Sequence, residues 1–241
     1  MSRLPSIPKK HFDIKTKYIK GGKLTLTPFS VGMESLLLQV KDGTPEEKRS
    51  AIRQLVEECL ITKNIDVDKI PMFIIEEIFL RLRQHSIGEI IDKQYQCTNE
   101  VEEGKPCNSP MTLKLDLNEF KLIENPIHTK TIMVSDPIGI VFRYPDLSMA
   151  DMKEVEDGET ETILSCIETI FNGDDVYNTE DYTRDELLEF WNQFSLMQKK
   201  DVFDRFFHSM PTFNHEQTIK CPKCGYDHKL KFSSMEDVFR Q

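Results

Sequence analysis

Cys-Pro-Lys-Cys-Gly at residues 221–225 and Cys-Thr-Asn-Glu-Val-Glu-Glu-Gly-Lys-Pro-Cys at residues 97–107 are the stretches that decide the fold. A cysteine pair that closes a tight turn holds two sulfurs about one metal–ligand distance from a common point. Two such pairs make the tetrahedral four-sulfur site that Zn²⁺ prefers. We therefore predict a structural zinc site that joins two parts of the chain more than a hundred residues apart. Its predicted ligands are Cys97, Cys107, Cys221 and Cys224.

The two cysteine pairs differ in how specific they are. The pair in residues 221–225 has the short spacing of a zinc knuckle, and its glycine permits a turn with positive φ. The pair in residues 97–107 is wider, which an insertion at residues 100–106 would explain. Two alternatives stay open: His215 or His228 replaces one sulfur, or the hairpins pack without metal. Four thiolates leave no open coordination position, so the site is predicted to be structural rather than catalytic.

Length and charge limit the classes of function. The chain has 241 residues, with 41 acidic and 31 basic side chains and a formal charge of −10. This balance argues against general affinity for phosphate backbones, which requires clustered Lys and Arg. No apolar run is long enough to span a membrane, and the first residues lack the apolar core of a signal peptide. We expect a cytoplasmic protein whose cysteines are reduced or metal-bound.

We predict an α+β fold with a mainly helical body and small antiparallel β-hairpins that form a zinc-ribbon-like module. The first segment is a basic extended arm, although a frayed terminus with one edge strand at residues 23–27 fits equally well. The predicted segments are an arm at 1–28, a helical region at 29–86, a β-hairpin region with the first cysteine knuckle at 87–145, a helical region at 146–212, and a second knuckle hairpin at 213–241 that packs on the first.

Capping signals and helical periodicity define the expected helices. Three sequences have the form of a capping box, in which Ser or Thr precedes Glu or Gln by three positions. They begin at Thr44, Thr183 and Ser195. Further helices are predicted from Pro71 to His85, over Glu159–Phe171 and, short, at Ser234–Phe239.

Alternating apolar and polar residues define the expected hairpins. The first joins strands at Ile87–Cys97 and Met111–Leu117, with the first cysteine pair at its tip. The second lies within Thr131–Tyr144. The third joins Glu216–Lys220 to His228–Phe232 around the second cysteine pair.

The remaining motifs do not indicate an enzyme. No glycine-rich phosphate loop, metalloprotease helix or nucleophile elbow occurs in the sequence. Cys59 lies on an apolar helical stripe and is expected in the core, whereas Cys166 lies between such positions and is expected to be partly exposed. The acidic stretch at residues 174–181 lacks the glycine and terminal glutamate of an EF-hand and is expected to be a solvated loop.

The order of these features resembles that of a viral family. The basic arm, helices ending Arg-Leu-Arg-Gln-His-Ser-Ile-Gly-Glu at residues 81–89, and paired cysteines are similar to those of the baseplate hub and hub-assembly proteins of T4-type contractile-tailed bacteriophages. The resemblance also rests on Ile-Asp-Val-Asp-Lys-Ile-Pro-Met-Phe-Ile-Ile-Glu-Glu-Ile-Phe-Leu-Arg-Leu-Arg at residues 65–83. It covers about residues 28–232.

The resemblance implies a non-enzymatic protein that acts in the host cytoplasm during late assembly and, if it stays in the particle, in the virion baseplate. It would be a hub component or an assembly chaperone, with other hub or tape-measure proteins as partners and neither membrane nor nucleic acid. The alternative function is that of a zinc-ribbon nucleic-acid-binding accessory protein. Four lysines around the second knuckle favour this alternative: Lys220, Lys223, Lys229 and Lys231.

Overall fold

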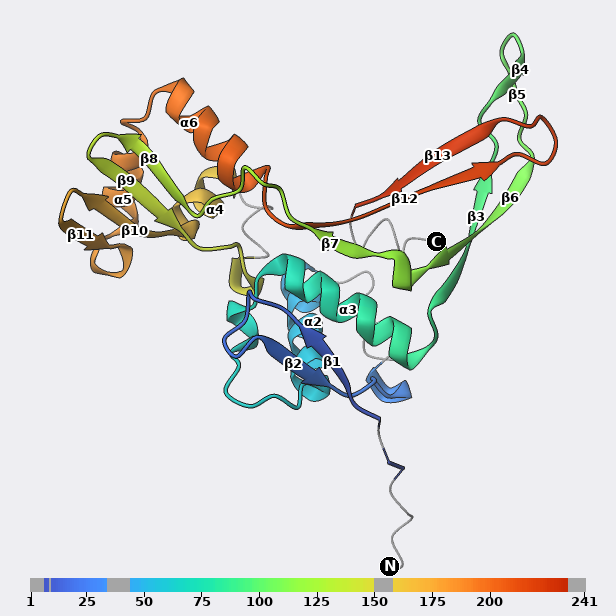
Figure 1. Cartoon of the computed structure of the whole chain (residues 1–241), viewed down its shortest axis with the longest axis horizontal. Coiled ribbons are helices and arrows are strands. Elements are labelled where there is room, and N and C mark those ends of the chain that lie inside the picture. Colours follow the sequence, from blue (N-terminus) through green and yellow to red (C-terminus); the bar gives the residue numbers. More distant parts are fainter. Residues whose placement is uncertain (1–6, 9, 34–43, 150–157, 234–241) are drawn as a thin grey trace, which may run out of the picture.

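The computed structural model describes residues 7–8, 10–33, 44–149 and 158–233. Of these residues, about 36% lie in helices and 33% in strands. The strands form five antiparallel sheets. The prediction of a mainly helical body is therefore wrong, although both kinds of element are present. Figure 1 shows a body near the N-terminus, a second lobe, and two long hairpins that project from them.

The body near the N-terminus packs a two-stranded sheet against two helices. The strands β1 (Phe12–Lys15) and β2 (Lys23–Leu26) pair in register, so the strand expected at residues 23–27 is present. Ile14, Leu24 and Leu26 are buried in the same apolar cluster as the two helices. From residue 12 onward, this segment is thus a packed hairpin and not a weakly folded arm. The helices are α2 (Pro45–Cys59) and α3 (Met72–Ser86), joined through the short η1 (Val67–Lys69).

The local signals for these helices are confirmed. Thr44 accepts a hydrogen bond from the Glu47 N–H, the Glu47 side chain bonds back to the Thr44 N–H, and Pro45 occupies the first turn. The equivalent capping boxes at Thr183 and Ser195 are also formed. Capping satisfies N–H groups that would otherwise lack partners at a helix start. The helix expected at residues 234–239 lies outside the described residues.

The second lobe explains most of the error in the fold class. Its sheet has the order β11-β10-β9-β8 and packs against three α-helices, η3 and η6 around one apolar cluster. The helix expected over Glu159–Phe171 ends at Cys166, and the following residues, half of them β-branched, form β10, which pairs with β9. Tertiary pairing here outweighs the helical periodicity. The elements are β8 (Thr131–Ser135), β9 (Ile138–Phe142), η3 (Leu147–Met149), α4 (Gly158–Cys166), β10 (Ile167–Asn172), β11 (Asp175–Asn178), η5 (Thr179–Asp181), α5 (Arg184–Trp191), α6 (Leu196–Val202) and the π-helix η6 (Phe203–Phe207).

The two projecting hairpins are the first and third that the sequence predicts. One consists of β3 (Ile90–Gln96) and β6 (Pro110–Asp116), and the other of β12 (Thr212–Lys220) and β13 (Asp227–Phe232). They share an apolar cluster that includes Leu113, Leu115 and Phe232. Near the body, β12 also pairs with β7 (Lys121–Ile123), which follows η2 (Leu117–Glu119). The tips of the hairpins meet at the opposite end, far from the helices (Figure 1).

The division into five segments stays a prediction. The apolar clusters nevertheless follow the body, the second lobe and the hairpins, except that Leu80 of α3 lies in the hairpin cluster and Leu147 of η3 lies in the body cluster. Tyr144 packs against both of the first two clusters and so links the body with the lobe.

Candidate metal centre

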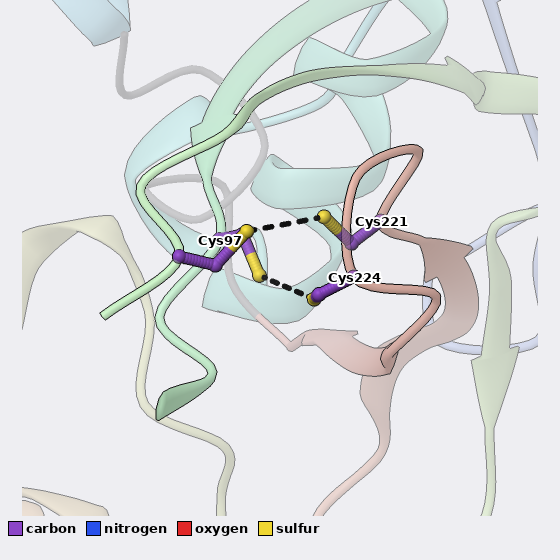
Figure 2. A group of neighbouring side chains, drawn as sticks. Cys97, Cys221 and Cys224 are labelled. Carbon is purple, nitrogen blue, oxygen red and sulfur yellow. Dashed lines mark hydrogen bonds between the residues drawn. The ribbon is translucent and has the colours of Figure 1, made fainter. Parts of the chain in front are cut away.

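The four predicted ligands meet where the two hairpin tips come together. Cys97 follows β3 directly, and Cys221 follows β12 directly. Their partners are Cys107, which follows the short strand β5 (Lys105–Pro106), and Cys224, in the turn before β13. In Figure 2 a dashed line joins Cys97 to Cys224 across the gap between the tips, and Cys221 lies beside them. Cys97, Cys107 and Cys221 are buried, and Cys224 is partly buried.

The second knuckle is closed by two backbone hydrogen bonds. The N–H of Gly225 donates to the carbonyl of Cys221 at 3.0 Å, and the N–H of Cys221 donates to the carbonyl of Tyr226 at 2.8 Å. Gly225 has a φ of 75°, which residues with a Cβ rarely adopt. This turn directs N–H groups toward the sulfurs and suits thiolates.

The first knuckle has the same two bonds despite its wide spacing. The N–H of Asn108 donates to the carbonyl of Cys97 at 2.9 Å, and the N–H of Cys97 donates to the carbonyl of Ser109 at 2.9 Å. Asn108, with a φ of 50°, takes the place that Gly225 has in the other knuckle. Asn is the non-glycine residue that best tolerates this conformation.

The extra residues of the first knuckle form a hairpin of their own. The strands β4 (Glu100–Glu102) and β5 pair with each other, and the N–H of Cys107 donates to the carbonyl of Asn99 at 2.8 Å. Residues 100–106 therefore leave and re-enter the knuckle at one point. Without them, the sequence would read Cys-Thr-Asn-Cys-Asn, a C-x2-C pair like the second. The wide spacing is thus compatible with ordinary knuckle geometry.

The sulfur positions match a tetrahedral centre. All four lie within 4.8 Å of one another. Cys97 Sγ lies 3.5 Å from Cys224 Sγ, and Cys107 Sγ lies 3.8 Å from Cys221 Sγ. Zinc–sulfur bonds of about 2.3 Å in a tetrahedron require sulfurs about 3.8 Å apart. The four side chains could therefore hold one metal ion with little movement.

The protonation of the thiols follows from their surroundings. Burial raises the pKa of Cys97 to about 12 and also raises the pKa of Cys107. A hydrogen bond from the backbone N–H of Cys224 lowers the pKa of Cys221 to about 6. Four sulfurs in such close contact cannot all ionise unless a cation compensates their charge. A bound divalent ion would supply that charge and displace the remaining protons.

The structure separates the two histidines that the sequence left open as ligands. His228 Nε2 lies 3.2 Å from Cys97 Sγ, so this ring borders the cluster. His215 instead packs against Phe120 and lies 3.4 Å from a Glu119 oxygen, in the shared cluster of the hairpins. His215 is therefore not part of the thiol group. His228 can donate a hydrogen bond to a sulfur without replacing it.

Sequence reasoning missed the contributions of two asparagines. Asn99 Nδ2 donates to Cys224 Sγ at 3.7 Å, across the junction of the two hairpins. Asn108 supplies the left-handed residue of the first knuckle. The signal was an Asn directly after Cys107, at the position where Gly225 follows Cys224. The sequences of the two knuckles align only when residues 100–106 are left out of the comparison.

The other two cysteines have no role at this site. Cys59 is buried in the core of the body, as predicted. Cys166 is completely buried, and the expectation of partial exposure is wrong, because α4 ends there with this face against the sheet. Burial raises the pKa of Cys166 to about 12, so it stays a neutral thiol.

Fold and site together define an α+β protein in which two hairpins are joined at their tips by a cluster of four thiols. The sequence model of one family, described as T4 bacteriophage base plate protein, matches residues 11–240. The chain belongs to this family, which confirms the resemblance seen in the sequence and makes it a phage baseplate protein. No curated protein and no solved structure matches the chain.

Two further findings bear on the function. Membership of a baseplate family points to other phage structural proteins as partners and gives the nucleic-acid-binding alternative no support. Within the described ranges, none of the helices has the length and apolar character to cross a membrane.

Proposed function

We propose that Cys97, Cys107, Cys221 and Cys224 bind one Zn²⁺ ion as a structural clamp. The support is the sulfur geometry, which matches the separations of a tetrahedral four-thiolate site. Thiolates are the ligands that select zinc among the common divalent ions. Zinc bound this way supplies folding free energy, about 10–16 kcal/mol in small zinc-finger peptides. Other contacts already order these hairpins, so the gain here is smaller.

The proposed role of the protein is non-enzymatic, as a component or assembly chaperone of the baseplate hub, with other hub or tape-measure proteins as partners. The observation that carries this proposal is the cluster at the joined tips, in a chain that belongs to a baseplate family. A clamp with four thiolates leaves no position for water or substrate. It makes two hairpins into one stiff projection, which is useful for presenting a surface to a partner.

The role can be tested in infected cells. Tagged protein should co-purify with hub and tape-measure proteins, and the Cys224→Ala variant should recover less of them. The matched control Cys59→Ala changes a cysteine outside the cluster and should recover as much as the unchanged protein.

A second experiment separates a hub component from an assembly chaperone. Mass spectrometry compares purified particles with infected-cell extracts. A hub component is present in both samples, and a chaperone only in the extract. Recovery of neither kind of partner would refute the role.

A further inference from the structure

The strand β11 forms one edge of the sheet in the second lobe. It pairs with β10 on one side only, over Asp175–Asn178. All four of its residues are exposed. Figure 1 places it at the margin of the lobe, remote from the joined hairpin tips. Among the residues that the structure describes, no strand pairs with its outer side. Its outward N–H and C=O groups can therefore pair with an added strand.

Apolar and aromatic surface is exposed along the same edge. Val176 is 63% exposed, Tyr177 37% and Tyr182 40%. The rings of Tyr177 and Tyr182 lie edge to face, with centroids 6.3 Å apart. Exposed aromatic side chains beside unpaired backbone groups are typical of surfaces that bind an extended segment of another protein.

The surroundings of β11 are strongly acidic. Residues 172–189 contain seven carboxylates and a single basic side chain, Arg184. Arg184 forms ion pairs with Glu161 and Asp185, so its charge is already compensated by these two carboxylates. Five exposed carboxylates have no ion-pair partner within the described part of the chain. They are Asp174, Asp175, Glu180, Asp181 and Glu189.

This charge decides which occupant fits. A second copy that paired edge to edge along β11 would bring acidic side chains of both copies together, which is unfavourable. A segment with alternating basic side chains would instead find opposite charges beside each backbone contact.

We propose that the outer edge of β11 binds a basic, extended segment of a partner protein, which adds to the sheet as a fifth strand. Backbone hydrogen bonds to β11 supply the pairing, and Val176 and Tyr177 contact the side chains of the added strand. The carboxylates select basic sequences and speed their association. The inference rests on the proposed function and deepens it by naming a class of partner segment. The test of this inference involves neither metal nor particle assembly, so the inference and the proposed function can fail separately.

A synthetic peptide tests this edge directly. The probe is a fluorescein-labelled octapeptide of alternating Lys and Val. Its control has Pro in place of each Val, which keeps the charge, removes the N–H donor at each replaced position and favours a polyproline conformation that pairs poorly with a strand. Fluorescence anisotropy on the full chain at about 50 mM salt measures both affinities, because charge contacts are only weakly screened there. We expect the Val peptide to bind at least about tenfold more tightly than the Pro peptide.

Paired charge variants locate the binding. The double variant Asp175→Lys with Asp181→Lys should weaken binding of the Val peptide by about tenfold or more. The matched control, Glu100→Lys with Glu103→Lys on the β4–β5 hairpin, makes the same charge change on exposed residues and should leave the affinity unchanged. Where the first variant is poorly folded, Asp175→Asn with Asp181→Asn replaces it. The NMR chemical shifts of the backbone amides of Val176 and Asn178 should change when the Val peptide is added.

Three results would overturn the inference. Equal affinity for the Val and Pro peptides would show attraction by charge alone. An equal loss in both charge variants would show that the site is not at β11. Dimerisation of the free chain that Val176→Lys abolishes would show that a second copy occupies this edge.

Discussion

The thiol sulfurs of Cys97 and Cys224 lie 3.5 Å apart, although 127 residues separate the two positions in the chain. All elements of the second lobe, from β8 to η6, are contained between them. A cross-link that closes a loop of about 100 residues lowers the entropy of the unfolded chain by an amount worth about 4–5 kcal/mol. A metal bound here would stabilise the ends of the hairpins, and it would restrict the unfolded chain only as long as the ion stayed bound.

Replacement of one ligand should release the metal. Cys224→Ala leaves three sulfurs and should lower zinc content from one ion per chain to near zero, measured by atomic emission after dialysis. The melting temperature should fall, and amide exchange of β12 and β13 should rise. Cys59→Ala serves as the control and should keep the zinc while losing about 1 kcal/mol of stability. Unchanged zinc content and melting temperature in Cys224→Ala would contradict the clamp.

The conformation of Asn108 predicts opposite effects of two substitutions. Asn108→Gly should leave the free energy of unfolding nearly unchanged, because glycine adopts a positive φ freely. Asn108→Val should cost about 1–2 kcal/mol, since a β-branched residue is strained at the observed φ of 50°. Urea unfolding of the metal-loaded proteins measures both. Equal stability of the two variants would show that this backbone conformation is not held in solution.

The inserted hairpin should be dispensable for metal binding. Deletion of residues 100–106 joins Asn99 to Cys107, whose backbone atoms are already hydrogen-bonded at 2.8 Å. The shortened chain should bind one zinc ion per molecule, as the full chain does, in a competition titration with a chromogenic chelator. Cys224→Ala provides the negative control. Loss of zinc from the shortened chain would mean that the insertion itself shapes the site.

The N-terminal hairpin should contribute to stability. Leu24 is fully buried, so Leu24→Ala should cost about 2–5 kcal/mol. The neighbouring Lys23 is exposed, and its ion pair with Asp13 at 3.3 Å is a surface pair, so Lys23→Ala should change stability by less than about 1 kcal/mol. Deletion of residues 1–20 removes β1 and should also destabilise the protein. If none of these three changes altered the melting temperature, the segment would be an arm and not part of the folded body.

His128 should make stability depend on pH below neutrality. Both nitrogens of its ring are within hydrogen-bond distance of a hydroxyl group. Nδ1 lies 3.0 Å from Ser209 Oγ, and Nε2 lies 3.0 Å from Tyr144 Oη. Burial lowers the pKa of His128 below its usual value of 6.5. The unfolded chain therefore takes up this proton at a higher pH than the folded chain, and stability falls as pH drops below about 6.5.

The test for His128 compares pH profiles of the unfolding free energy. His128→Gln cannot titrate and should show a shallower fall between pH 7 and pH 5 than the unchanged protein. His208→Gln is the control, because His208 is largely exposed on the same lobe. Identical slopes for the unchanged protein and His128→Gln would show that the ring stays accessible to protons in the folded state.

Local sequence signals predicted much of this structure because they act over a few residues. The capping boxes at Thr44, Thr183 and Ser195 are formed, and the alternating residues of β6 are buried in turn. The four cysteines are brought together as expected, although their metal stays a prediction. Cysteine spacing specifies proximity well, since a shared ion restricts where the sulfurs can lie.

The errors occur where distant contacts decide. Ile167–Asn172 has helical periodicity, but pairing with β9 makes it a strand. The acidic stretch at residues 174–181, expected to be a solvated loop, contains the strand β11 (Asp175–Asn178), since a short hairpin needs only a turn at Gly173. Burial of Ile14 likewise depends on helices that lie far along the chain. Local patterns carry no information on such pairings.

The β4–β5 hairpin also has a practical consequence. It begins and ends at a single hydrogen-bonded point, and its turn lies at the outermost end of the paired hairpins (Figure 1). A short epitope or a gold-binding tag spliced in at Gly104 would extend away from the rest of the chain. Electron microscopy of tagged particles could then give the position and copy number of this subunit, with little disturbance to how it folds.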